Sequence, residues 1–79
     1  MIFVTGGAGF IGANFVLRWL GRHDEPLLVV DKLTYAGNLE NLAAVQADPR
    51  FSFHRLDIND RAALEQLLHA HQPRAVLHF

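Results

Sequence analysis

The glycine-rich stretch at residues 5–12, TGGAGFIG, constrains the fold of this chain more than any other part of it. The apolar run at residues 1–4 before it is typical of a strand, and the apolar run at residues 10–20 after it is typical of a helix. A G-x-G-x-x-G pattern is weak evidence when it stands alone, but between a strand and a helix it indicates a phosphate-binding turn.

The glycines of this turn have separate expected roles. Gly6 or Gly7 permits the tight turn after the strand, where a Cβ would clash. Gly9 lets a diphosphate approach the backbone, and Gly12 lets the helix pack closely on the strand. The helix N-terminus then directs free N–H groups and a partial positive charge toward the phosphates. The alternative interpretation is a glycine turn without a ligand.

The composition is that of one small domain. The chain has 79 residues, a formal net charge of −1 and no cysteine, so neither a disulfide framework nor a nucleic-acid or membrane partner is indicated. A hydrophobic share of 51% is high for so short a chain and suggests surface that further protein covers. No apolar stretch approaches the ~20 residues that span a bilayer, and no signal peptide precedes the first strand. We therefore expect a cytoplasmic protein.

Apolar periodicity predicts strands that alternate with helices along the whole chain. This order, β-α-β-α-β-α-β, predicts an α/β protein with a partial Rossmann fold, in which residues 1–79 form a parallel sheet of strand order 3-2-1-4. The alternating pattern of residues 51–56 favours the sheet edge for the third strand. The expected strands are residues 2–5, 27–30, 51–56 and 75–79, and the expected helices are residues 10–22, residues 39–45, and a helix capped by Asn59 or Asp60 that runs to about residue 71.

An acidic residue, Asp31, ends the second predicted strand nineteen residues after Gly12. In a dinucleotide site a carboxylate at this place accepts hydrogen bonds from the adenosine ribose and repels a 2′-phosphate, which favours NAD over NADP. Lys32 weakens that preference because a cation beside the ribose can attract a phosphate. The alternative is an ordinary solvated aspartate at a strand end.

A second acidic residue, Asp57, ends the third predicted strand and is followed by Ile58. The carboxylate can receive the adenine amino group while the apolar neighbour covers the ring, although Asp57 can equally cap a turn before Asn59. The five histidines show no spacing typical of a zinc site, so no metal is expected.

The stretch at residues 5–12 resembles the cofactor motif of the extended short-chain dehydrogenase/reductase superfamily, a motif that also suits nucleotide-sugar epimerases. The stretch at residues 31–42, DKLTYAGNLENL, is more specific and resembles the dTDP-glucose 4,6-dehydratase family, as do residues 57–58, 72–73 and 76–79. The resemblance covers essentially the whole chain but only the N-terminal part of those longer enzymes. The cofactor contacts that it implies, all to NAD, are Phe10 and Ile11 at the glycine turn, Asp31, Lys32, Leu33 and Thr34 on the ribose side, and Asp57 and Ile58 at the adenine.

The resemblance also implies a reaction for the longer enzyme. Bound NAD⁺ takes hydride from C4 of dTDP-glucose, water leaves across C5–C6, and the hydride returns to C6 to give dTDP-4-keto-6-deoxyglucose. The family's catalytic residues and sugar pocket lie beyond residue 79, so no catalytic residue is expected here and the chain alone should be inactive. The longer enzyme is expected to be a homodimer.

Two other interpretations remain open at this point. The chain can be part of an NAD-dependent nucleotide-sugar epimerase, or a stand-alone dinucleotide-binding module without catalysis. Because residues 75–79 would form an apolar strand at a sheet edge, the isolated chain is expected to self-associate or to be partly unfolded.

Overall fold

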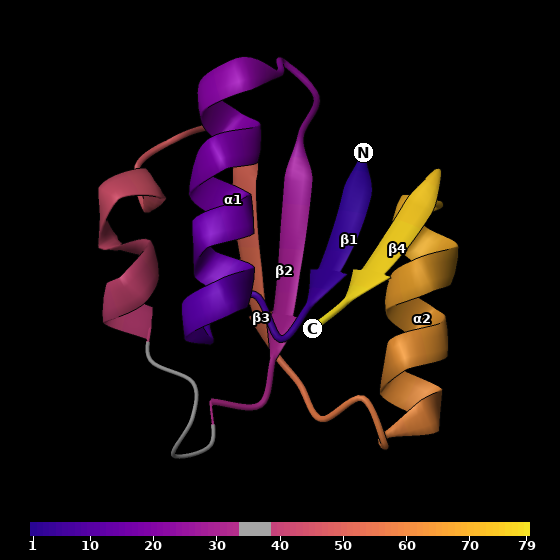
Figure 1. Ribbon diagram of the computed structural model, residues 1–79. Coiled ribbons are helices and arrows are strands. Elements are labelled where there is room, and N and C mark those ends of the chain that lie inside the picture. The colour runs from indigo at the N-terminus through magenta and orange to yellow at the C-terminus, as the bar shows by residue number, and fades with distance from the viewer. Residues whose placement is uncertain (34–38) are drawn as a thin grey trace.

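The computed structural model describes residues 1–33 and 39–79. A four-stranded parallel sheet of order β3-β2-β1-β4 forms its centre, as the sequence predicts. Helix α1 and the short 3₁₀ helix η1 cover one face of the sheet, and α2 covers the other (Figure 1). The elements are β1 (Ile2–Thr5), α1 (Phe10–Arg22), β2 (Leu27–Asp31), η1 (Leu39–Val45), β3 (Phe51–Arg55), α2 (Arg61–His71) and β4 (Ala75–His78).

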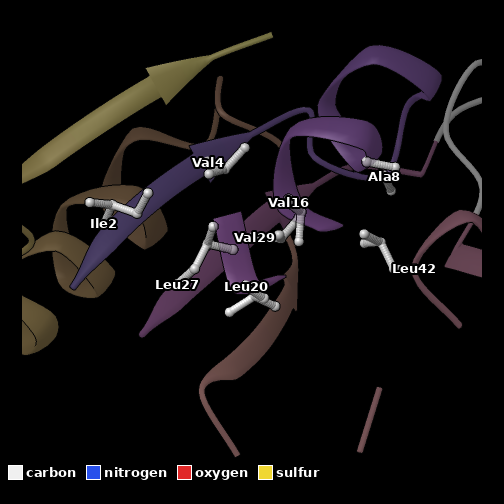
Figure 2. Close-up of a cluster of buried hydrophobic side chains, with 9 residues drawn as sticks. Ile2, Val4, Ala8, Val16, Leu20, Leu27, Val29 and Leu42 are labelled. Carbon is white, nitrogen blue, oxygen red and sulfur yellow. The ribbon is translucent and has the colours of Figure 1, made fainter. Parts of the chain in front are cut away.

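The two central strands, β1 and β2, are apolar throughout because both of their faces are covered. Successive side chains point to opposite faces, so Ile2 and Val4 join the cluster beneath α1, whereas Phe3 packs on the α2 side. The cluster beneath α1 is the larger of the two, and it also takes in Val16 and Leu20 from the helix itself (Figure 2).

Helix α1 lies along the sheet with one buried stripe. Asn14, Arg18 and Arg22 are exposed on the opposite side. At the first turn Phe10 and Ile11 are also exposed, by 77% and 71% of their surface, although both are apolar. The apolar circumference of α1 is therefore only partly covered by residues 1–33 and 39–79.

The outer elements are covered less than the centre. Strand β3 lies at the edge of the sheet, as predicted, and its residues are half-buried or exposed. Asp60, one of the two predicted caps, caps α2 by accepting a hydrogen bond from the Ala63 N–H at 3.3 Å. None of the residues of α2 is fully buried. In the part of the chain that the structure describes, no helix has the length and apolar character needed to cross a membrane.

Two ion-paired clusters close the end of the sheet where the strands begin. The Glu25 carboxylate accepts hydrogen bonds from the Met1 amino group at 2.8 Å and from Arg74 at 2.6 and 2.7 Å. Arg74, and secondly the amino group, lower the pKa of Glu25 to about 2. Nearby, Arg50 binds Asp48 at 2.7 Å. Its guanidinium also donates to two carbonyl oxygens at the C-terminus of α1, those of residues 20 and 23, at 2.9 and 2.7 Å.

Candidate functional site

The turn from β1 into α1 requires glycine at both of the positions that the sequence left as alternatives. Gly6 has a φ of +72°, in the left-handed region, and a Cβ there would lie 3.1 Å from the carbonyl carbon and oxygen of Phe79. Gly7 needs space instead, because a Cβ would lie 2.7 Å from the Cγ1 atom of Val29. One glycine is required by backbone conformation and the other by packing.

Gly12 brings α1 against the turn itself. A Cβ at this position would overlap the carbonyl oxygen of Gly6 and lie 2.9 Å from the Cα of Gly7. The expected close approach is therefore present, but its partner is the turn that precedes the helix and not the strand.

Gly9 is the residue from which α1 starts. It has an extended conformation and no side chain to cap the helix. Its N–H donates to the Gly6 carbonyl at 3.2 Å, and its carbonyl accepts from the Ala13 N–H at 2.8 Å. The N–H groups of residues 10–12, in the first turn, have no acceptor within the helix. The positive end of the α1 dipole thus faces outward beside a backbone that carries no bulky side chain.

The Asp31 carboxylate shapes the backbone on both sides of it. One oxygen accepts a hydrogen bond from the N–H of Ala8, in the glycine turn, at 2.9 Å. The other accepts from the Leu33 N–H at 2.8 Å and so stabilises Leu33 at a φ of 59°, which is uncommon for such a residue. Each oxygen keeps a second lone pair for a further donor. The sequence predicts a role for Asp31 toward a ligand but not this role toward the turn.

Lys32 and Asp57 form an ion pair of 3.2 Å at the ends of the neighbouring strands β2 and β3. The Asp57 carboxylate also accepts from the Asn59 N–H at 2.9 Å, the turn-capping bond that the sequence left as an alternative. That backbone bond, and secondly Lys32, lower the pKa of Asp57. Ile58 beside it is 40% exposed, so an apolar side chain is available at the surface next to a charged carboxylate.

Two hollows lie on either side of the glycine turn, and Gly6 lines both of them. The first is at the carboxyl ends of β1, β2 and β3, and its lining includes Asp31, Asp57 and Ile58. The second is apolar and is lined by Gly9, Phe10, Ile11, Gly12 and Phe79. The structure therefore brings all but two of the predicted residues, Leu33 and Thr34, to these two hollows. Lys32 also lines the first, Leu33 lies in an adjoining hollow with Lys32, and Thr34 lies outside the described residues.

The first hollow also contains residues that sequence reasoning did not connect with the site. The Thr5 hydroxyl lies 2.6 Å from Nδ1 of His78, across the ends of β1 and β4. The strand order alone indicates that these residues are neighbours, because β4 pairs with β1. Within residues 1–33 and 39–79, no three His, Asp or Glu side chains are grouped so that they could hold a metal ion.

A parallel sheet of order 3-2-1-4 with a glycine turn between its first strand and first helix defines the Rossmann class of nucleotide-binding folds. The family model described as GDP-mannose 4,6 dehydratase matches residues 3–79, and the chain belongs to this family.

Relatives confirm the predicted resemblance. A dTDP-glucose 4,6-dehydratase of Neisseria meningitidis serogroup B is 48% identical over 77 residues, which are 98% of this chain and 22% of that protein. The dTDP-glucose 4,6-dehydratase of Bacillus anthracis, solved in complex with NAD, has a TM-score of 0.93 at 37% identity and covers 99% of this chain and 26% of its own. A UDP-glucose 4-epimerase of Thermotoga maritima has a TM-score of 0.83 at 35% identity over 99% of this chain and 23% of its own. The chain spans about a fifth of the length of the curated relatives that it matches.

Proposed function

We propose that residues 1–79 are the N-terminal part of the NAD-binding domain of a dTDP-glucose 4,6-dehydratase. The observation that carries this proposal is the pair of hollows joined at Gly6, with the uncapped N-terminus of α1 between them. A dinucleotide has two ends joined by a diphosphate, and this arrangement offers a place for each part. The two dehydratases named above support the same substrate, and the Bacillus anthracis structure, solved with NAD, supports the same cofactor.

Different residues of the site would bind different parts of the cofactor. Asp57 and Ile58 would receive the adenine, and the free lone pairs of Asp31 would accept the ribose hydroxyls, with Lys32 and Leu33 beside them. The first-turn N–H groups of α1 would bind the diphosphate over Gly9, while Phe10 and Ile11 would cover it. When bound, NAD would accept and return the hydride of the dehydration. The chain would contribute binding and orientation, and no catalytic residue.

Cofactor choice follows from two charges. The Asp31 carboxylate would repel a 2′-phosphate, and Lys32 is paired with Asp57 at 3.2 Å, so its charge is already balanced. The longer protein should therefore bind NAD in preference to NADP.

Calorimetric titration of the full-length protein with both nucleotides tests this proposal. We expect the unsubstituted protein to prefer NAD, and Gly9→Val to abolish binding because the side chain would occupy the approach of the diphosphate. Gly21→Val, on the same helix, is the matched control, since a Cβ there meets nothing within 4 Å. Equal affinities for NAD and NADP, or NAD binding by a folded Gly9→Val variant, would contradict the proposal.

An epimerase is the second candidate, supported by the Thermotoga maritima structure but at lower similarity than the dehydratases. The reaction product separates the two, since only the dehydratase forms dTDP-4-keto-6-deoxyglucose from dTDP-glucose. Its absence on incubation of the NAD-loaded full-length protein with dTDP-glucose would exclude the dehydratase.

The expected assembly and location belong to the same proposal. We propose a cytoplasmic enzyme that acts as a homodimer, and an isolated 79-residue chain that self-associates. Val76 in the edge strand β4 is 54% exposed, and Phe79 after it is 44% exposed, which gives an apolar edge for another chain to pair with. Light scattering that finds a monodisperse monomer of the isolated chain would refute self-association.

A further inference from the structure

We infer that Asn41 is a positioning residue of the dinucleotide site: its side-chain amide holds the peptide group after Ala8 and so fixes the glycine turn in the shape that receives a diphosphate. This inference rests on the proposed function. Nothing in the G-x-G-x-x-G pattern points to Asn41, which lies 33 residues after Ala8.

The contacts of Ala8 carry the first step of the argument. Asn41 donates a hydrogen bond from Nδ2 to the Ala8 carbonyl at 2.9 Å, and Asp31 accepts one from the Ala8 N–H, also at 2.9 Å. Ala8 itself is completely buried. Both backbone polar groups of this residue are therefore bound to side chains that come from other elements.

The next step follows from the planarity of the peptide bond. The Ala8 carbonyl and the Gly9 N–H belong to one rigid plane, so an acceptor bond at one end orients the donor at the other. That N–H donates to the Gly6 carbonyl at 3.2 Å and closes the turn. Gly9 is also the residue from which α1 starts. Asn41 thus fixes the direction in which the first-turn N–H groups of α1 point.

The position of Asn41 is itself fixed by its neighbour in η1. Leu42 is completely buried and belongs to the same apolar cluster as Ala8 and Val16, and Figure 2 shows its side chain within that cluster. Helix η1 also packs against α1. The Asn41 amide is therefore attached to an anchored segment, whereas its own side chain lies at the surface.

The composition of the turn explains why such a bond is needed. Three of residues 6–9 are glycines, which have the greatest backbone freedom, so an unsupported turn would have to be ordered at the moment of binding. A donor that orders the turn beforehand increases affinity for the diphosphate. It adds nothing for a ligand that lacks phosphates, and this difference separates positioning from general stability.

The test compares Asn41→Ala and Asn41→Asp in the full-length protein, titrated with NAD, with ADP, and with adenosine in competition. Asp has the shape of Asn but cannot donate this bond and would face the Ala8 carbonyl with a charge. We expect both variants to weaken NAD and ADP by about three- to tenfold, a typical loss for one hydrogen bond, and to leave adenosine unchanged. Hydrogen exchange should become faster at residues 6–12 and stay the same in β1 and β2.

Gln46→Ala is the matched control, an exposed amide just after η1 whose loss should change none of these affinities. If the unsubstituted protein binds neither NAD nor ADP, the proposed function is wrong. If it binds both and the Asn41 variants bind them equally well, the positioning role is wrong. Full affinity in Asn41→Asp, or an equal loss for adenosine and ADP, would also overturn it, because the first indicates mere space filling and the second a general loss of stability.

Discussion

The two ends of the sheet use their polar groups in different ways. Where the strands begin, charged side chains bind one another and the last carbonyls of α1, and both Glu25 and Asp48 have lowered pKa values because of neighbouring arginines. Where the strands end, Asp31 binds backbone N–H groups of the loops around it, and the first-turn N–H groups of α1 have no side-chain cap. Apolar side chains are exposed there as well.

This difference separates stability from binding within one small sheet. At the amino end, the charged groups of Glu25, Asp48, Arg50 and Arg74 bind partners within the chain. At the carboxyl end, the hydrogen bonds of Asp31 hold the backbone in one shape. The first-turn N–H groups of α1 and several apolar side chains there remain accessible to a ligand. Parallel α/β sheets bind ligands at this end, and the contrast shows why the opposite end is not equivalent.

Substitution of the glycines at the two ends of α1 should give the largest difference in stability and in NAD affinity. Gly12→Ala would place a methyl group against the Gly6 carbonyl oxygen, so α1 must move away from the turn. We expect it to destabilise the domain by about 1–3 kcal/mol and to reduce NAD affinity at least about 100-fold. Gly21→Ala meets nothing within 4 Å and should stabilise the helix by about 0.5–1 kcal/mol.

Thermal unfolding and NAD titration of both variants measure this difference. Because the same substitution is made in the same helix, helix propensity is matched and only the surroundings differ. Similar unfolding temperatures and affinities for the two variants would show that the close approach at Gly12 has no consequence.

Asp31→Ala should have the next largest effect on binding. It removes the acceptor for the Ala8 N–H as well as the proposed acceptor for the ribose, and we expect NAD to bind more weakly by about 1–3 kcal/mol. Asp48→Ala, which removes a carboxylate from the amino end, should leave NAD affinity unchanged. Calorimetric titration of both variants with NAD measures this difference. Equal losses of NAD affinity would contradict the distinction between the two ends of the sheet.

The smallest expected effect is a pH dependence at the amino end. The pKa of Glu25 is about 2 in the folded chain, against 4.5 for the free side chain, so the carboxylate stabilises the fold fully above pH 4.5. That stabilisation should be lost as the pH falls from 4.5 toward 2. Unfolding temperatures of the unsubstituted protein and of Glu25→Gln should therefore differ at neutral pH and converge over this range. A constant difference down to pH 2 would contradict the assignment.

The fold could be predicted from sequence because its information is local. Apolar runs with periods of two and 3.6 mark the strands and helices, and the rule for right-handed crossovers then leaves few arrangements of four parallel strands. The cap of α2 at Asp60, one of the two residues predicted for it, follows from the same kind of local pattern.

The internal support of the site could not be predicted in the same way. The side chains of Asp31 and Asn41 bind the backbone of Ala8, which lies 23 and 33 residues before them in the sequence. Every residue has the same backbone groups, so the sequence does not indicate which of them a distant side chain will bind. The close contact of Gly12 could not be predicted for the same reason, because it is made with the backbone carbonyl oxygen of Gly6. Asp57 and Lys32 could be placed at neighbouring strand ends, but their pairing depends on the conformation of two loops.

The approach of Phe79 to Gly6 sets an order of events during synthesis. Strands β1, β2 and β3 leave the ribosome first and can pair as they emerge, whereas β4 must return to β1 across a separation of 73 residues between Thr5 and His78. The Phe79 backbone, which confines the position of Gly6, emerges only after all four strands. The turn is the first part of the chain to be made after β1, yet its contact with the Phe79 backbone can form only when residue 79 has left the exit tunnel. A nascent chain shorter than this carries the whole glycine motif without the backbone contact that confines Gly6.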